Sequence, residues 1–213
     1  MARPLTFSPA APPALGDSAL NPVYHSWISA LMRQMERVEI SDSQGRPLSP
    51  DQGFARLKEL SLAARSRRSA LYFIGNGASA SMASHFSTDL AKNAGLATHT
   101  FSDPALLTCL ANDLGAAEMF SAALSRCGRQ GDLLVAISSS GSSPNILRAL
   151  QTADELSMGV ITFTGMKSDN PSRRLGDLNF WVPSNTYGHA ETAHAALLHH
   201  WVDLLVEPRY QHE

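Results

Sequence analysis

Cysteine is scarce in this sequence, and no hydrophobic run is long. Cys109 and Cys127 are the only two cysteines of the 213 residues, and their spacing matches no zinc-ligand or redox motif. No apolar leader region follows the start MARPLTFSPAAPPALG, so we expect reduced thiols and a cytoplasmic protein. The longest apolar runs, such as LLVAI at 133–137, fall far short of the roughly 20 residues that a membrane-spanning helix needs. We therefore expect no membrane association.

An excess of charge of one sign is also missing. The chain has 17 Lys and Arg residues against 19 Asp and Glu, a formal net charge of −2, and no block of like charges. This balance argues against nucleic acid as a partner. The sequence contains neither G-x-x-x-x-G-K-[ST] nor G-x-G-x-x-G, which excludes a nucleotide P-loop and leaves little support for dinucleotide binding. An anionic ligand would need a local site.

The chain is long enough for one domain with a sizeable core, because 44% of its residues are hydrophobic. Residues 1–20 are rich in proline and predict a mobile N-terminal arm, 21–207 a single domain, and 208–213 a C-terminal tail. Apolar residues at three- and four-residue spacing predict a helix from Pro22 to about Ile40. A turn-rich segment at 41–53 separates it from a second helix at 54–65.

Short apolar runs then alternate with helical segments. Strands are predicted at 70–74, 132–137, 158–164 and 178–182. Such alternation is typical of βαβ units, and it predicts a three-layer α/β fold with a doubly wound parallel sheet and an extra N-terminal helix. Every predicted strand ends in a loop rich in Gly, Ser, Asn or Thr. In a doubly wound sheet these loops gather at one edge, where ligands bind.

Two of these loops have the composition of an anion site. GNGAS at 75–79 follows the first strand, and SSSGSSPN at 138–145 follows the second and precedes a helix. Hydroxyl groups and the backbone N–H groups of a helix N-terminus suit an anion that needs many hydrogen-bond donors, and phosphate is the simplest such anion. The alternative is that these residues only cap helices and close turns.

A set of His, Asp and Glu residues follows helical spacing. His85 and Asp89 are four residues apart and share one helix face, as a metal or proton site or as a solvated pair. In the last predicted helix, Glu191 and His194 share a face and His199 lies two turns beyond Glu191. Together they offer nitrogen and oxygen ligands for a divalent metal. His194 has the alternative of a hydrogen bond at a subunit interface. We interpret His189 and His200 as ordinary residues, and Met82, Phe86 and Leu90 as core.

The stretches FIGNGASASMASHFSTDL, ISSSGSSPNILRAL and VITFTG resemble the sugar isomerase (SIS) domain, a flavodoxin-like fold that binds phosphosugars. The likeness runs from about Pro22 to Leu205. Within that superfamily the chain is similar to the phosphoheptose isomerase family, homotetramers that convert sedoheptulose 7-phosphate to glycero-manno-heptose 7-phosphate. The resemblance implies a phosphorylated sugar as substrate, a homotetramer, one zinc ion per subunit and no organic cofactor.

The resemblance also implies roles for individual residues. The substrate contacts it implies are Asn76, Gly77, Ser79, Asn112, Asp113, Ser138, Ser139, Ser140, Ser143 and Glu191, with the serines at 138–143 on the phosphate. The family's zinc motifs HxxxE and QxxxxxxxH align with His85–Asp89 and Glu191–His199, so His85, Asp89, Glu191 and His199 form the expected metal set. Asp stands for Glu and Glu for Gln. A substrate-contacting Asp of the family is Gly188 here, which puts heptose specificity in doubt.

An aldose–ketose isomerase moves a proton between C1 and C2, and Asp89 and His199 are the candidate catalytic pair. Three alternatives stay open: an isomerase of another phosphosugar, a phosphosugar-binding sensor, and a non-enzymatic tetrameric adaptor that resembles the protein associated with the replication initiator DnaA. The ionisable Asp89 and His199 favour an enzyme over the adaptor. Apolar residues of the first and last helices, such as Trp27 and Trp201, predict a tetramer with a central helical bundle and sites that borrow residues from a neighbouring copy.

Overall fold

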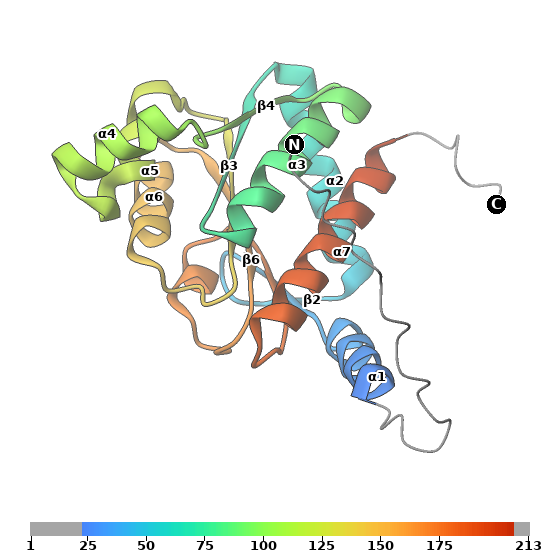
Figure 1. Cartoon of the computed structure of the whole chain (residues 1–213). Coiled ribbons are helices and arrows are strands. Elements are labelled where there is room, and N and C mark those ends of the chain that lie inside the picture. Colours follow the sequence, from blue (N-terminus) through green and yellow to red (C-terminus); the bar gives the residue numbers. More distant parts are fainter. Residues whose placement is uncertain (1–22, 207–213) are drawn as a thin grey trace, which may run out of the picture.

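The protein, a computed structural model that describes residues 23–206, is built around one seven-stranded sheet (Figure 1). The strand order is β2-β1-β7-β6-β5-β3-β4. The strands are β1 (Glu39–Asp42), β2 (Pro47–Leu48), β3 (Ala70–Gly75), β4 (Ala97–Thr100), β5 (Leu133–Ser138), β6 (Gly159–Thr164) and β7 (Leu178–Trp181). The terminal arm and tail predicted at 1–20 and 208–213 lie outside the described residues. No helix within residues 23–206 is long and apolar enough to cross a membrane.

Five of the strands are parallel, and their order β4-β3-β5-β6-β7, with β4 at the edge, is that of a flavodoxin-like doubly wound sheet. β3, β5, β6 and β7 are predominantly apolar, as parallel strands covered on both faces require. Every residue of β5 is buried, for example. The four strands predicted from the sequence are confirmed to within one residue at each end, and so is the three-layer α/β fold. β4, whose residues ATHT are largely polar, was not predicted.

Helices cover both faces of the sheet, with α4, α5 and α6 on the left and α2, α3 and α7 on the right in Figure 1. The helices are α1 (Val23–Glu36), α2 (Pro50–Arg67), α3 (Ala78–Ala94), α4 (Pro104–Leu114), α5 (Met119–Cys127), α6 (Pro144–Glu155) and α7 (Tyr187–Leu205). Each face has its own core. Leu57, Phe86 and Trp201 are fully buried on the α2–α3–α7 side, and Leu124 and Leu150 on the α5–α6 side.

The N-terminal region differs from the expectation. The helix predicted to reach Ile40 ends at Glu36, and the chain continues as β1, which pairs antiparallel with β7 at the edge of the sheet. Ile40 is only 2% exposed because it faces the core from this added strand. The predicted turn-rich segment contains the β1–β2 hairpin, and α2 begins at Pro50 rather than Phe54. A reciprocal capping box between Ser49 and Gln52 fixes that earlier start.

Candidate active site

The turn from β3 into α3 is tight enough to require glycine. A Cβ atom at Gly75 would lie 2.6 Å from the backbone carbon and oxygen of Ser79, a separation that real Cβ atoms do not adopt. Gly77 has a φ of +57°, which favours glycine. The two glycines let α3 begin at Ala78, directly beyond the carboxyl end of β3. The N-terminus of α3, with its partial positive charge, therefore lies at the switch point between β3 and β5.

The serine loop after β5 (138–143) is fixed by contacts with Asn170 and Ser172. Gly141, at its centre, has a φ of +60°, and its N–H donates to Ser138 O and Oγ at 3.0 and 3.2 Å. The Ser172 hydroxyl donates to Gly141 O at 2.8 Å. A Cβ atom at Gly141 would overlap Oδ1 of Asn170, a buried side chain that donates to Lys167 O. The loop therefore keeps one conformation, with its hydroxyl groups at the strand ends.

These two loops and the start of α7 enclose a cavity of about 140 Å³. We call it the serine cavity, and its lining residues are Asn76, Ser79, Ile137, Ser138, Ser139, Ser140, Ser143, Tyr187 and Glu191. The Ser139 hydroxyl is buried without a hydrogen-bond partner among the described residues. Ser143 is the N-cap of α6, yet its side chain makes no capping bond. The cavity therefore offers hydroxyl donors that the fold itself does not use, together with the positive end of α6.

Most of the predicted substrate-contacting residues line this cavity. Gly77 is not in the lining but acts as the N-cap of α3 beside it. Asn112 and Asp113 are exposed on α4, where Asn112 Nδ2 donates to Asp113 Oδ1 at 2.9 Å, and they do not line the cavity either. Their contact with substrate stays a prediction.

Two further residues belong to the site and were not predicted. Tyr187, the first residue of α7, lines the cavity. Asn145 exchanges two hydrogen bonds with Asn76, at 3.0 and 2.9 Å, and so joins the β3–α3 loop to the start of α6. The polar loop PSNTYG and the Asn of SSSGSSPN were the only signals for them in the sequence.

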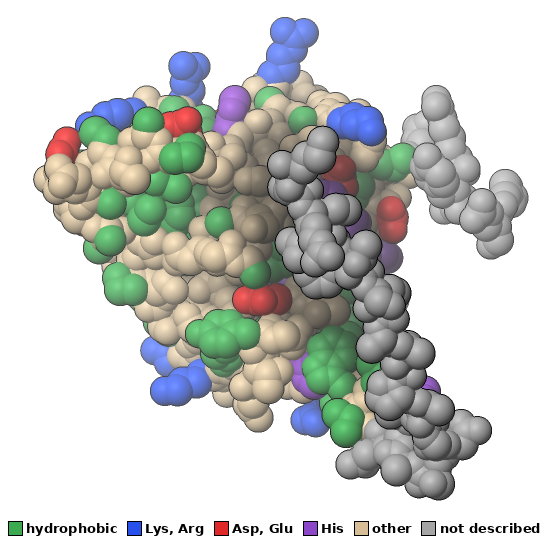
Figure 2. All heavy atoms as spheres, viewed as in Figure 1, with side chains coloured by type: hydrophobic (Ala, Val, Ile, Leu, Met, Phe, Trp, Pro, Cys, Tyr) green, Lys and Arg blue, Asp and Glu red, His purple; other side chains and the backbone are tan. Residues whose placement is uncertain are grey.

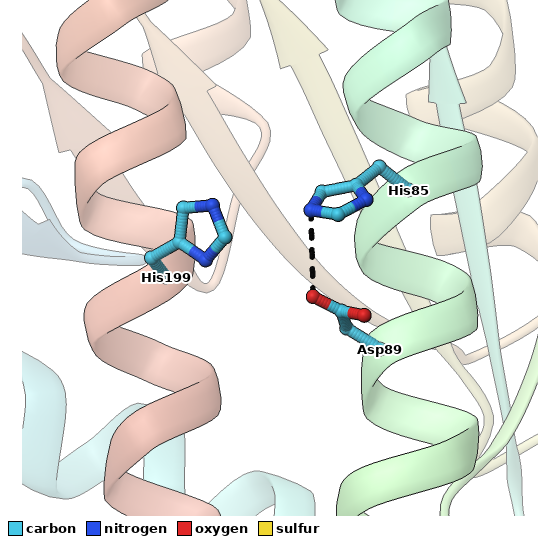
Figure 3. Close-up of side chains that lie close together, drawn as sticks. All are labelled: His85, Asp89 and His199. Atoms are coloured by element: carbon cyan, nitrogen blue, oxygen red, sulfur yellow. Dashed lines mark ion pairs between the residues drawn. The ribbon is translucent and has the colours of Figure 1, made fainter.

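A second cluster lies farther along α3 and α7. Figure 3 shows His85 and Asp89 of α3 pointing toward His199 of α7. His85 Nε2 is 3.4 Å from Asp89 Oδ2, and one ligand atom from each of the three residues lies within 4.8 Å of the others. The His199 ring packs on Phe86, a core residue as predicted, with centroids 4.7 Å apart. Asp89 has a side chain only 26% exposed, whereas both histidines are exposed, so the cluster opens to solvent on the side of its imidazoles.

Glu191 does not join this cluster within one chain. It lines the serine cavity, eight residues before His199 on the same helix, and eight residues of α-helix rise about 12 Å. The predicted four-residue metal set is therefore divided: the structure brings together His85, Asp89 and His199, and places Glu191 with the serines.

His194 is not a ligand of this cluster. It is fully buried, and its Nε2 donates to the Thr164 carbonyl at 2.9 Å, which ties α7 to the end of β6. Burial lowers the pKa of the imidazole to about 4, so the ring is neutral near pH 7. The hydrogen bond is made within the chain rather than at a subunit interface. His189 packs on Trp27 and His200 on Phe54, in agreement with their interpretation as ordinary residues.

Comparison with known proteins identifies several phosphoheptose isomerases to which this chain is similar. A phosphoheptose isomerase of Bordetella avium is 34% identical over 151 residues, which are 66% of this chain and 76% of the relative. That of Aeromonas hydrophila is 36% identical over 137 residues, or 62% and 71%. The solved structure of phosphoheptose isomerase GmhA from Neisseria gonorrhoeae has a TM-score of 0.76 at 26% identity, over 88% of this chain and 99% of that one.

More distant structures share the fold alone. The Vibrio vulnificus NanR protein, solved with ManNAc-6P, has a TM-score of 0.65 at 20% identity over 92% of this chain and 65% of that one. The family model of the SIS domain matches residues 50–165, a span that includes the loops at 75–79 and 138–145, His85 and Asp89. Because this family model matches more than half of its length, the chain belongs to the SIS domain family.

Proposed function

We propose that the protein is a phosphosugar isomerase that interconverts an aldose and a ketose, with sedoheptulose 7-phosphate or a related phosphosugar as substrate. The observation that carries this proposal is that α3 and α7 both begin at the serine cavity and both lead to the cluster of His85, Asp89 and His199. The serine cavity suits a phosphate, and the cluster holds groups that can transfer a proton. Relatives named phosphoheptose isomerase support the same reaction.

The serine cavity would position the substrate through its phosphate. The partnerless Ser139 hydroxyl and the Ser143 hydroxyl are available as donors, and two helix N-termini add their partial positive charge. Among the described residues the cavity lining contains no Lys or Arg, and it includes one carboxylate, Glu191. Recognition would therefore depend on neutral donors. Binding energy at the phosphate holds the reactive end of the sugar in place.

The proton transfer would fall to Asp89 and His199. Isomerisation removes a proton from one of C1 and C2 and returns it to the other through an enediol, which needs a base and an acid close to both carbons. A carboxylate and an imidazole on facing helices can divide these roles. The reaction needs no organic cofactor, since the carbon skeleton stays intact and no external electron acceptor is involved.

The same residues fit a zinc ion. Two imidazoles and a carboxylate form a three-ligand set with a position open for substrate, which is the arrangement of catalytic zinc sites. A bound zinc ion would polarise the carbonyl and hydroxyl oxygens of the sugar. His85, Asp89 and His199 would then all serve as ligands, so the zinc-assisted reaction is an alternative to direct proton transfer by Asp89 and His199.

We also propose that the protein works as a homotetramer in the cytoplasm. α1 stands beside the lower end of α7 in Figure 1, and Tyr24 (70% exposed) and Met32 (58%) leave much of its apolar surface uncovered. A bundle of α1 and α7 from several copies would bury this surface. Such an assembly would also let Glu191 of one copy approach the His85–Asp89–His199 cluster of another.

The identity of the sugar is the least constrained part of the proposal. Gly188, at the family's substrate-contacting Asp position, leaves open space, since a Cβ atom there would meet only Trp27, at 4.0 Å. A related phosphosugar with a different polar group at that point would fit equally well. Sedoheptulose 7-phosphate is the first substrate to test because the relatives carry that activity in their names.

Paired variants separate the isomerase from a sensor and from an adaptor. Calorimetry should show that Ser140→Ala with Ser143→Ala weakens binding of sedoheptulose 7-phosphate, whereas Ser125→Ala, an exposed serine of α5, does not. Asp89→Asn should keep the affinity and abolish turnover, as followed by chromatography of the sugar phosphates. Binding without turnover in the wild type would indicate a sensor. The absence of binding to any phosphosugar would contradict the proposal and favour an adaptor.

A further inference from the structure

A groove of about 500 Å³ lies at the opposite end of the sheet from the serine cavity. It is lined at the amino ends of β3 and β5 and beside the edge strand β4. Helices α5 and α6 pack over the inner strands of this face, and β4 is its outermost strand (Figure 1). We call it the arginine groove and define it by Arg68, Tyr72, His99, Phe101, Arg126 and Arg129. Nothing in the isomerisation uses these residues.

The floor of the groove is a row of aromatic rings. Tyr72 stacks on Phe101, with centroids 5.7 Å apart and an interplanar angle of 13°. His99, on the neighbouring strand β4, stacks on Tyr72 of β3 at 5.4 Å and 27°. The Tyr72 hydroxyl donates to Cys127 O at 3.0 Å, which fixes the orientation of the central ring. Tyr72 and Phe101 are buried, whereas His99 is exposed and presents the ring system to a ligand.

The rim of the groove is positively charged. Arg68, Arg126 and Arg129 are exposed, and within residues 23–206 none of their guanidinium groups pairs with a carboxylate. The lining includes one acidic residue, Asp132, whose carboxylate already accepts from the Ala70 N–H at 2.8 Å and the Arg129 N–H at 2.9 Å. Arg126 Nη1 donates to Ala122 O at 2.6 Å, and the remaining donors of the three guanidinium groups are available to an external anion.

The backbone of Arg68 adds to this pattern. This residue ends α2 in the left-handed conformation with a φ of +59°, where glycine is the usual choice. An arginine at such a position keeps a guanidinium group at the mouth of the groove at some cost in backbone energy. Figure 2 shows several Lys and Arg side chains along the upper rim of the molecule, the end at which the parallel strands begin.

We propose that the arginine groove binds a free nucleotide, with the planar base against His99 and the phosphates on the arginines. Guanidinium groups bind phosphate oxygens in bidentate geometry, and aromatic rings stack on bases irrespective of their sequence. The volume lies within the range of small-molecule sites. The groove and the serine cavity lie at opposite ends of the same strands, so a nucleotide here would act on the enzyme as a regulator and not as a substrate.

Calorimetry on the full chain with ADP, adenosine and pyrophosphate tests this site. ADP should bind at least tenfold more tightly than either fragment, since only ADP has both a base and phosphates. Arg126→Ser with Arg129→Ser should weaken ADP binding at least tenfold, and the same loss of two charges at Arg37 and Arg174, both exposed and outside the groove, should not. His99→Ala should weaken ADP binding but leave that of pyrophosphate unchanged.

Three results with the wild type and the groove variants would overturn the proposal. They are no detectable ADP binding, pyrophosphate binding as tight as that of ADP, or unchanged ADP affinity in the Arg126 and Arg129 double variant. A matching thermal unfolding midpoint for each variant and the wild type guards against misfolding as a cause. ADP affinity that falls with Ser140→Ala instead would place the nucleotide in the serine cavity and also contradict the proposal.

Discussion

Acid should destabilise this protein through His194 in a way that one substitution can remove. The ring is fully buried, donates from Nε2 to Thr164 O, and has an Nδ1 atom without a hydrogen-bond partner in the described part of the chain. Burial lowers its pKa from 6.5 to about 4. Well above pH 6.5, as at pH 8, the ring is neutral in both the folded and the unfolded chain, so the shift has no effect there.

The magnitude follows from the two pKa values. As the pH falls below 6.5, the unfolded chain takes up a proton that the folded chain accepts only near pH 4, so the free energy of unfolding declines across this window. Each pH unit corresponds to about 1.4 kcal/mol. At pH 5, which is 1.5 units below the unfolded pKa, His194 should have reduced the stability by about 2 kcal/mol relative to pH 8.

His194→Gln is the matched perturbation because an amide N–H can still donate to Thr164 O but does not titrate. Urea unfolding at pH 8, 7, 6 and 5, with a chelator present, should show that the variant loses about 2 kcal/mol less than the wild type between pH 8 and pH 5. His200→Gln, at an exposed position of the same helix, should follow the wild type. If His194→Gln and the wild type show the same pH dependence, the ring is not held neutral and the reasoning fails.

Three further predictions concern the loops and the metal. Gly141→Ala should lower the free energy of unfolding by about 1–3 kcal/mol, because Ala resists the positive φ and its Cβ would overlap Asn170; chemical unfolding measures this, and an equal value would contradict it. Asn76→Ala and Asn145→Ala should show a coupling energy of about 1 kcal/mol in a double-mutant cycle, whereas additive effects would mean that their paired hydrogen bonds contribute nothing. Asp89→Ala should weaken zinc binding at least tenfold in competition with a chromogenic chelator, and unchanged affinity would remove the three-residue site.

Local pattern was sufficient to predict the serine cavity and four of the five parallel strands, but not β4, whose residues ATHT contain no apolar run. The strands are apolar runs long enough to be recognised alone, and loops that follow parallel strands must meet at one sheet edge. β1 was missed because Val38 and Ile40 continue the helical spacing of α1. Its pairing partner β7 lies about 140 residues away, and no local signal announces such a contact.

Site geometry was harder to predict than site composition. Helical spacing fixes the angle between Glu191 and His199 but not which neighbouring element each one faces, so the division between the cavity and the cluster needed the packed structure. The arginine groove combines residues from five segments between Arg68 and Asp132, and the near-neutral overall composition gives no sign of it. The arginines of the groove come together only once the chain is folded.

Proton NMR in D2O of sedoheptulose 7-phosphate with the purified protein, first with zinc and then with chelator, tests the central claim most directly. The proposed isomerisation predicts deuterium at C2 of a heptose 7-phosphate product, and its loss with chelator would assign the metal a role. Asp89→Asn provides the control, since it removes the proposed proton carrier. Wild-type protein that exchanges no deuterium into this sugar under either condition would contradict heptose isomerisation.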